Sequence, residues 1–269
     1  MKTLVTICLY QFATEANATR GYASLDVYRM WLRHLRTLGQ YQGDVLVFTN
    51  LDLPADDGVR TEAFAADPKN HREVCFCRVL ERDRYPYQQY DVILSMDVDI
   101  LTVAPLAPMF PSDDRFWVSP SNLRILDKQH AWHYLTPLQK LRYRFSPAWS
   151  KLGVSSCLLC ARTESWEGHM KVLGQRIQDE RAKHRPGMLH DQAHLNSLYL
   201  RDRNRFAVYP RSWIQHHSYL RNEECILWHF PGLPRRSEVM REFSARVLPA
   251  SDDLARGESR VCSAERPAS

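Results

Sequence analysis

Residues 90–101 read Tyr90-Asp91-Val92-Ile93-Leu94-Ser95-Met96-Asp97-Val98-Asp99-Ile100-Leu101. The apolar run in this stretch is short and has no helical period, which is typical of a buried strand. Asp97 and Asp99 follow the run directly, and two carboxylates at the end of an apolar strand need a partner if they are to stay ionised. Hard, closely spaced carboxylate oxygens suit a divalent cation, so the pair indicates a metal and diphosphate site. A strand end with two solvated carboxylates is the alternative interpretation of the same spacing.

Strands and helices alternate along the rest of the chain. Apolar runs and helical spacing predict strands at 3–10, 44–50, 74–80, 90–96, 116–119 and 154–161, helices at 24–38, 164–183 and 190–200, and two short strands at 206–209 and 226–230. This alternation predicts an α/β fold with a mostly parallel central sheet flanked by helices. Ligands bind beyond the carboxyl ends of the strands in such sheets, and Asp97 and Asp99 fall at such an end.

The composition suits one globular domain. The chain has 269 residues, of which 44% are hydrophobic, and we expect a single domain at 1–248 and a flexible polar tail at 249–269. The net charge of +5 fits anionic small molecules or a membrane surface as well as nucleic acid, and it is far from a histone-like balance. No apolar run is long enough to span a bilayer, and the N-terminus predicts a first strand rather than a signal peptide.

The seven cysteines are an odd number and lie mostly in apolar runs, which favours reduced thiols and a cytoplasmic location. Cys157 and Cys160 have the spacing of half a zinc site. On the strand expected at 154–161, an odd separation puts the two side chains on opposite faces. Buried structural cysteines are therefore favoured over zinc ligands.

The stretch from 122 to 151 differs from its surroundings because it mixes aromatic and basic residues and is interrupted by Pro137 and Pro147. These residues are Trp132, His133, Tyr134, Tyr143, Phe145, Trp149, Lys128, Lys140, Arg142 and Arg144. One interpretation is an irregular excursion packed on the domain. The other is a lid or acceptor platform, because aromatic faces stack on sugars or bases and basic groups meet anions.

Two further segments carry candidate site residues. In His190-Asp191-Gln192, with Asn196 one turn on, a helix starts with an acidic residue that can also cap it. The second segment is Trp228-His229-Phe230-Pro231-Gly232-Leu233-Pro234-Arg235-Arg236. There a histidine ends an apolar strand and a Pro-Gly turn leads to basic residues. A lone histidine is more often structural, but at a strand end in a chain that also has a metal-type aspartate pair it becomes a better candidate for a metal ligand. Arg235, just past the glycine turn, is a candidate phosphate ligand.

Together these segments resemble the GT-A glycosyltransferases, most closely the retaining family of the glycogenin-like and lipopolysaccharide-galactosyltransferase-like enzymes. The strand at 90–99 is similar to the family's "YxxVxYxDxD" strand, and 153–161 is loosely similar to "FNxGVxLxN", with Cys157 where glycine is expected. Residues 191–196 resemble "DQDxLN" with Ala193 for the second acid, and 229–235 resemble "HxxGxxK" with arginine for lysine. The order and spacing of these motifs are kept from residue 3 to residue 236.

The resemblance implies a metal and phosphate site. Asp97, Asp99 and His229 would hold Mn²⁺ or Mg²⁺, which bridges the diphosphate and acts as a Lewis acid toward the leaving nucleotide. Arg235 would support the same leaving group. Arg84, upstream of the aspartate pair, would contact phosphate or sugar, and a solvated arginine is the alternative there.

The remaining matched residues would contact the nucleotide sugar. The residues that would face the base and ribose are Thr6, Tyr10 and Gln11 at the end of the first strand, and Val98 lies within the Asp-x-Asp motif of the donor site. Asp191 and Gln192 would face the donor sugar near its reactive carbon, as the catalytic residues. Catalysis would then consist mostly of positioning and charge neutralisation.

The implied reaction moves a sugar, in the manner of a hexosyltransferase, from a nucleoside-diphosphate sugar to an acceptor hydroxyl with retention. UDP is the base expected from the family. The acceptor is a glycan, a lipid-linked glycan, a peptide or a small molecule, and a lipid-linked acceptor would bring peripheral contact with the inner membrane face. No specific nucleic acid is expected.

Two alternatives remain open. A nucleotidyltransferase also uses a metal and aspartates on a doubly wound fold, but this chain lacks the Gly-rich basic loop that normally follows the first strand in that class. A non-catalytic nucleotide-sugar-binding protein on the same fold is the other alternative.

Overall fold

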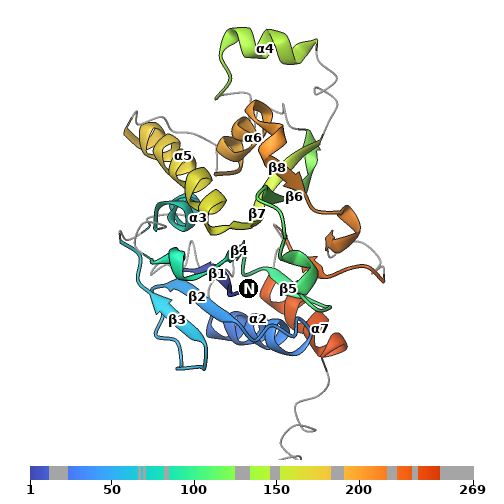
Figure 1. The fold of residues 1–269 in the computed structure, drawn as a ribbon. Helices are drawn as coiled ribbons and strands as arrows, with labels where there is room; N and C mark the ends of the chain where they lie inside the picture. Colours follow the sequence, from blue (N-terminus) through green and yellow to red (C-terminus); the bar gives the residue numbers. More distant parts are fainter. Residues whose placement is uncertain are drawn as a thin grey trace, which may run out of the picture.

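A seven-stranded sheet runs through the centre of the molecule, in the strand order β3-β2-β1-β4-β7-β6-β8 (Figure 1). Its strands are β1 (Thr3–Leu9), β2 (Asp44–Thr49), β3 (Val59–Glu62), β4 (Val92–Met96), β6 (Phe116–Arg124), β7 (Leu152–Arg162) and β8 (Phe206–Val208). The computed structural model describes residues 1–11, 24–65, 68, 71–81, 85–124, 134–145, 152–182, 191–216, 223–231 and 236–248. The tail expected at 249–269 therefore lies outside the described residues.

Most neighbouring strands in this sheet are parallel, as the sequence predicts. β1 pairs in parallel with β2 and β4, β2 with β3, and β6 with β8. β7 is the exception, because it runs antiparallel to both β4 and β6. β6 and β7 follow each other in the chain and lie side by side, so the chain turns back there without a crossover.

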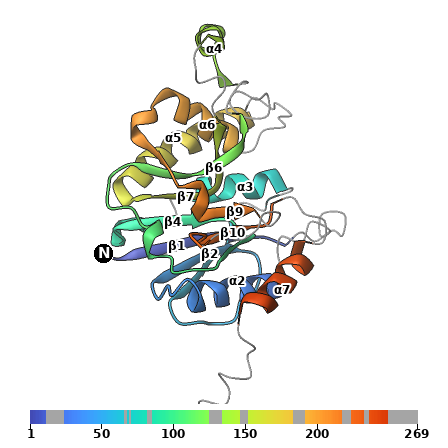
Figure 2. The same cartoon turned by 90° about the vertical axis from the view of Figure 1, so that its right-hand side faces the viewer.

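Helices cover both faces of the sheet (Figure 2). One face carries α2 (Leu25–Thr37) and α7 (Arg236–Val247), and the other carries α3 (His71–Leu80), α5 (Thr163–Ala182) and α6 (Asp191–Arg201). Trp31 of α2 belongs to the same hydrophobic core as Val5 of β1, whereas Trp166 of α5 shares a second core with Leu4. Successive residues of β1 thus face opposite cores, as the two-residue period of a strand requires.

Local sequence explains where α2 begins and ends. The Ser24 side chain accepts a hydrogen bond from the backbone N–H of Val27 at 3.2 Å, which caps the helix. The chain then turns away at Gly39, where a Cβ would lie only 2.5 Å from the backbone oxygen of Leu35. Only glycine fits that close approach, so the helix predicted at 24–38 ends where the sequence indicates.

The order of the strands reverses at β1. The chain passes from β1 through α2 to β2 on one side, and from β3 through α3 to β4 on the other side of β1. The carboxyl ends of β1 and β4 therefore lie next to each other at a topological switch point, which is where open α/β sheets bind their ligands. Asp97 follows β4 at this point.

A second, three-stranded sheet completes this edge. Its strands are β5 (Ile100–Thr102), β9 (Ile214–His216) and β10 (Leu227–His229), in the order β5-β10-β9. β10 is antiparallel to β5 in a register that sets His229 opposite Ile100. The backbone N–H of Phe230 donates to the carbonyl of Asp99 at 3.0 Å. The short strand predicted at 226–230 thus lies directly beside the Asp-x-Asp motif.

The prediction of a strand at 74–80 is wrong, because these residues belong to helix α3. Phe76 and Val79 are both buried and lie three residues apart, which is the spacing of one helix face. A short apolar run does not by itself distinguish a strand from a buried helix. The third strand of the sheet is instead β3, whose sequence Val-Arg-Thr-Glu is polar and partly exposed and carries no strand signal.

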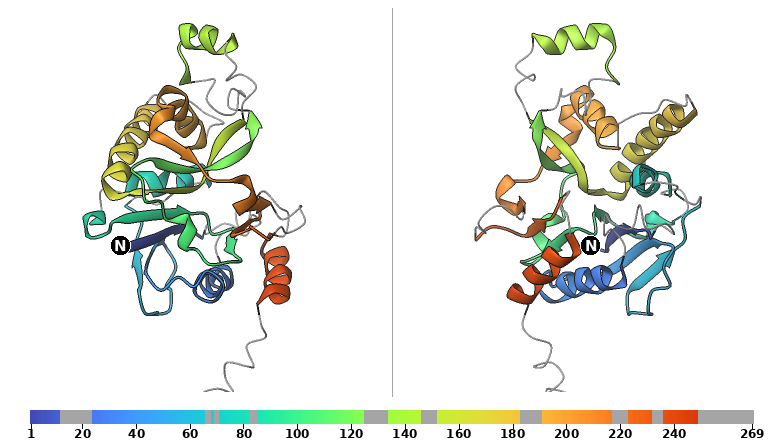
Figure 3. Two further views of the ribbon diagram at one scale, coloured as in Figure 1. Left: turned by 45° about the vertical axis from the view of Figure 1, so that its right-hand side comes forward. Right: turned by 180° about the vertical axis from the view of Figure 1, so that it is seen from behind.

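The aromatic and basic stretch at 122–151 is not irregular throughout, because it contains α4 (Pro137–Arg144). This helix stands away from the sheet and its covering helices (Figure 3). Short 3₁₀ helices lie at Tyr87–Gln89, Ala107–Met109, Arg203–Arg205 and Arg211–Trp213. Within the described part of the chain, every helix is too short or too polar to cross a lipid bilayer.

Candidate functional site

Asp99 and His229 meet at the carboxyl end of β4. His229 Nε2 lies 3.6 Å from Asp99 Oδ1, and both side chains are buried, at 10% and 5% exposed. The pairing of β10 with β5 explains this approach, since it sets His229 one residue from Asp99 across the two strands. The backbone N–H of Asp97 donates to the carbonyl of Cys157 at 2.9 Å, which ties the Asp-x-Asp turn to β7.

Arg236 is the residue at this site that sequence reasoning missed. Its Nη1 atom lies 2.7 Å from Asp99 Oδ2, and both side chains are only 5% exposed. The other oxygen, Oδ1 of Asp99, is buried and has no hydrogen-bond partner. Arg236 directly follows Arg235, the residue that the sequence predicts as a phosphate ligand. The presence of a second arginine in the next position was the signal that could have identified Arg236.

The charge state of His229 is set by its neighbours. Burial alone would lower the pKa of His229, but the Cys157 thiol and the Asp99 carboxylate, with a smaller effect from Asp97, outweigh burial and raise it to about 9. A hydrogen bond with Cys157 acts in the same direction. The imidazole, the thiol and the two carboxylates therefore form one electrostatic group.

The oxygen and nitrogen donors of this group fit a divalent cation, and Arg236 would compete with the cation for Asp99. Asp99 Oδ1 is an unsatisfied buried anionic oxygen, and an imidazole nitrogen lies beside it. Among the described residues, however, no three His, Cys, Asp or Glu side chains are gathered closely enough to hold a metal ion as they stand. The guanidinium of Arg236 supplies positive charge to Asp99 in the present arrangement.

The start of α6 is joined to β7 by side-chain hydrogen bonds. The Ser156 hydroxyl donates to Asp191 Oδ1 at 3.0 Å, and the Ser155 hydroxyl donates to Gln192 Oε1 at 3.3 Å. Asn196 accepts from the backbone N–H of Val154 at 2.8 Å and donates to its carbonyl at 2.7 Å. The two serines directly precede Cys157, whose carbonyl bonds the backbone of Asp97. The start of the helix predicted at 190–200 is therefore joined to the part of β7 that lies beside the Asp-x-Asp turn.

Tyr10 and Gln11 follow β1 at the same edge. The Tyr10 ring packs edge-on against Phe64, with 5.3 Å between ring centroids. The backbone of Gln11 exchanges two hydrogen bonds with the Asn50 side chain, each 2.8 Å long, across the ends of β1 and β2. Parallel strands bring these residues to the edge that carries Asp97.

Two further predicted donor-binding residues, Thr6 and Val98, are buried. Thr6 sits in the middle of β1, buried and aligned with Ser95 of β4, and is not at the strand end. The side chain of Val98 is buried in a hydrophobic core, which leaves its backbone as the part that can face a ligand. Arg84 and Arg235 lie outside the described residues.

Cys157 and Cys160 are both buried, as predicted, but they belong to the same hydrophobic core. The expectation that they face opposite sides is wrong, because β7 shifts register against β6 between Val118 and Ser119 and the two-residue alternation is lost there. Burial raises the pKa of Cys160 to about 12, so this thiol stays protonated.

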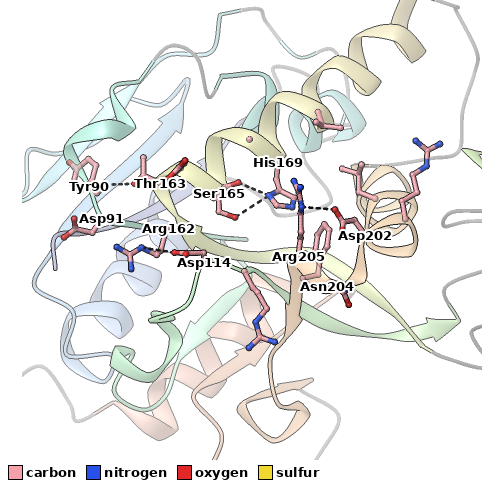
Figure 4. A pocket seen from close by; sticks show the side chains of 17 residues that line it. Tyr90, Asp91, Asp114, Arg162, Thr163, Ser165, His169, Asp202, Asn204 and Arg205 are labelled. Carbon is pink, nitrogen blue, oxygen red and sulfur yellow. Dashed lines mark hydrogen bonds and ion pairs between the residues drawn. The ribbon is translucent and has the colours of Figure 1, made fainter.

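A cavity of about 820 Å³ lies at the other end of β4 (Figure 4). It is lined from the start of β4, the end of β7 and the first turns of α5, and it holds none of the predicted site residues. Arg162 faces Asp114 across it at 3.5 Å, and Arg205 pairs with Asp202 at 2.9 Å. Its charged groups are thus largely neutralised by each other, and the sheet edge that carries Asp99, His229 and the start of α6 is the better candidate site.

No protein-family model matches this chain, and a comparison with curated proteins finds no relative. The α/β class, with a mostly parallel central sheet flanked by helices, follows from the strand order and pairing alone.

Proposed function

We propose that this chain is a GT-A type glycosyltransferase that uses Mn²⁺ or Mg²⁺ to move a hexose from a UDP-sugar to an acceptor hydroxyl, with retention. The observation that carries the proposal is the convergence of three sequence-distant segments on one sheet edge. Asp99 lies 3.6 Å from His229, and Asp191 is bonded to Ser156, next to the Cys157 carbonyl that holds Asp97. The resemblance of the same segments to the family's motifs supports the assignment.

Asp97, Asp99 and His229 are the residues that would hold the cation. When bound, the cation supplies Lewis-acid stabilisation of the departing diphosphate. Arg236, already beside Asp99, would shift from the carboxylate to a phosphate oxygen once Asp99 has another partner, because a guanidinium can bind either group. Because Arg236 is buried, little water screens its charge, and its attraction to a phosphate oxygen would be strong.

Asp191 and Gln192 would orient the donor sugar. They occupy the first turn of α6, where backbone N–H groups point outward. Ser155 and Ser156 of β7 donate hydrogen bonds to the side chains of Gln192 and Asp191. A pre-oriented carboxylate near the reactive carbon stabilises the positive charge that develops there as the diphosphate leaves.

One observation favours a second candidate, a non-catalytic nucleotide-sugar-binding protein on the same fold. Arg236 occupies Asp99 Oδ2 at 2.7 Å, and the described residues hold no ready group of three metal donors. A protein that binds nucleotide through Arg236 alone would need no metal and would not promote departure of the diphosphate.

Calorimetric titration of UDP tests the proposal. We expect binding that requires Mn²⁺, is abolished by EDTA, and weakens at least about tenfold in Asp99→Asn because one ligand charge is lost. Asp114→Asn, an equally conservative change of a 90% exposed carboxylate at the other end of β4, is the matched control and should bind UDP normally. Absence of UDP binding in the presence of Mn²⁺ overturns the proposal.

Turnover separates the two candidates. A glycosyltransferase releases UDP from UDP-glucose or UDP-galactose in the presence of Mn²⁺ and a mixture of acceptors, and this release should be lost in Asp191→Asn. Metal-independent UDP binding without release of UDP from either donor would favour the non-catalytic candidate instead.

A further inference from the structure

Helix α4 exposes large apolar side chains. Leu138, Leu141 and Phe145 are 76%, 54% and 80% exposed. They lie three, four and seven residues apart on α4 and the residue that follows it, so they line one stripe of the helix. Exposed apolar side chains that gather on one helix face mark an interaction surface, whereas single scattered ones do not. We call Leu138, Leu141 and Phe145 the α4 stripe.

The positive charge of the sequence is concentrated in the stretch that contains this helix. Residues 122–151 contain six basic residues and one acidic residue, Asp127, which is a net charge of +5. The basic residues are Arg124, Lys128, Lys140, Arg142, Arg144 and Lys151. Since the whole chain also has a net charge of +5, the other residues sum to zero. The partner of this region is therefore expected to be anionic.

The base of α4 is attached to the candidate site. The Tyr134 ring lies 4.1 Å from the His194 ring of α6, measured between centroids, and Leu135 is buried. α6 begins with Asp191, the proposed sugar-orienting residue. α4 itself projects beyond α6 and the ends of β6 and β7 (Figures 1 and 3). An object that α4 touches would thus be close to α6, the helix that begins with Asp191.

We propose that α4 docks this protein on an anionic lipid bilayer, with the α4 stripe inserted at the boundary between headgroups and acyl chains and basic residues of the helix, such as exposed Arg144, against the headgroups. A short helix with an apolar stripe and basic residues close in sequence is typical of helices that bind at a membrane interface. A nucleic acid would be met by the basic residues but would offer no apolar phase for two exposed leucines. The further consequence that the sugar acceptor is lipid-linked rests on the proposed function.

Vesicle co-sedimentation of the full chain tests the docking. The probes are phosphatidylcholine vesicles with and without about 30% phosphatidylglycerol, because anionic headgroups are the proposed partner. We expect binding to the anionic vesicles only, and a partition coefficient at least about tenfold lower in Leu138→Ser/Leu141→Ser/Phe145→Ser, since three apolar insertions are lost. Val172→Ser removes an exposed apolar side chain from α5 and should bind like the parent chain.

A charge variant and two readouts complete the experiment. Arg144→Glu should weaken vesicle binding and reduce its sensitivity to salt, whereas Arg241→Glu on α7 should not. The melting temperature and the Mn²⁺-dependent UDP affinity should stay unchanged in the triple variant, because its side chains are exposed and none belongs to the proposed metal or sugar site. Vesicle binding is measured without nucleotide, so it succeeds or fails independently of the glycosyltransferase proposal.

Three results would overturn the docking proposal. They are binding to neutral vesicles as strong as to anionic ones, anionic binding that the triple variant retains in full, and no binding to either vesicle. If a short RNA duplex binds tightly while the vesicles do not, the anionic partner is a nucleic acid instead.

Discussion

The two ends of β4 hold charged side chains in opposite environments. At the carboxyl end, Asp99 and Arg236 are 2.7 Å apart and each only 5% exposed. At the amino end, Arg162 and Asp114 are 3.5 Å apart and 50% and 90% exposed. Water screens the second pair, whereas the first pair cannot lose a partner without leaving a desolvated charge. The difference shows that burial, and not the mere presence of opposite charges, makes one end of this strand sensitive to change.

Histidines at the two ends differ in the same way. Burial would lower the pKa of His229, but Cys157 and Asp99 overcome it and raise the pKa to about 9. Burial lowers the pKa of His169, in the wall of the other cavity, and the carbonyl of Ser165 only partly opposes this. The two histidines differ because His229 has buried anionic neighbours that raise its pKa. Buried charges are therefore gathered at the end of β4 that carries the candidate site.

Replacing Arg236 should have the largest effect. Arg236→Met keeps much of the side-chain volume but removes the buried guanidinium that lies 2.7 Å from Asp99 Oδ2, so we expect the free energy of unfolding to fall by about 3–5 kcal/mol. Urea denaturation in the presence of EDTA measures it, and Arg241→Met, at an exposed position on α7, is the control. Mn²⁺ should then stabilise Arg236→Met more than the parent chain, because the cation replaces the lost charge. A loss below about 1 kcal/mol would show that the pair behaves like a surface one.

Asn196 tests whether the candidate site depends on the join between α6 and β7. Asn196→Ala removes the side chain that bonds both the backbone N–H and the carbonyl of buried Val154, and we expect a loss of about 2–3 kcal/mol in the free energy of unfolding. Thermal or urea unfolding measures this loss. Ser197→Ala, next along the helix, removes a hydroxyl that accepts from Arg176 and should cost less. Equal effects of the two changes would contradict a special role for the join.

The pH dependence of stability tests the histidine contrast. Because the folded-state pKa of His169 is lowered, the folded protein resists protonation there, and the unfolded chain binds more protons below the ordinary value of 6.5. This contribution to stability is present above pH 6.5 and is lost as the pH falls toward the lowered pKa. His169→Gln, which keeps a donor for the Ser165 carbonyl, should flatten the fall in unfolding free energy between neutral and acidic pH.

The fall should not vanish in His169→Gln, since the pKa of buried His34 on the other face is lowered as well. An unchanged or steeper fall in the variant would show that His169 is not protonated more readily in the unfolded chain. Chemical unfolding at several pH values between neutral and mildly acidic conditions provides the comparison.

The exposed pair at the amino end should show the smallest effect. Asp114→Asn should change the free energy of unfolding by less than about 1 kcal/mol, because a screened pair contributes little. A loss comparable to that of Arg236→Met would contradict the distinction between the two ends. Urea denaturation at low and high salt measures the change in unfolding free energy, and this change should be smaller at high salt because salt screens the exposed pair.

Signals along the chain were enough to predict much of the fold. Strands β1, β2 and β4 and helix α2 lie within one or two residues of their predicted bounds, because an apolar run, a helical period and the Ser24 cap act between near neighbours. The same kind of signal failed for α3, where seven apolar-rich residues suit a strand or a helix equally well. β3 was missed since its four residues are held by pairing with β2 and not by their own propensity.

The candidate site was predictable in its parts and not in its arrangement. The Asp-x-Asp pair, His229 and the Asp191–Gln192 helix start were marked by residue type and position, and the structure brings them to one edge. The pairing of Arg236 with Asp99 was not predictable, because these residues are distant in sequence and meet only through β5, β10 and α7. Thr6, placed by analogy at a strand end, is buried in mid-strand.

By itself, the sequence determined the α/β class, the strand that carries Asp97 and Asp99, and the positive, aromatic character of residues 122–151, since these depend on composition and on contacts between near neighbours. Only the tertiary structure decided that β7 runs antiparallel, that Arg236 neutralises Asp99, and that α4 presents Leu138, Leu141 and Phe145 to the outside. Each of these depends on how distant segments exclude water from one another, and burial of that kind is a property of the packed chain alone.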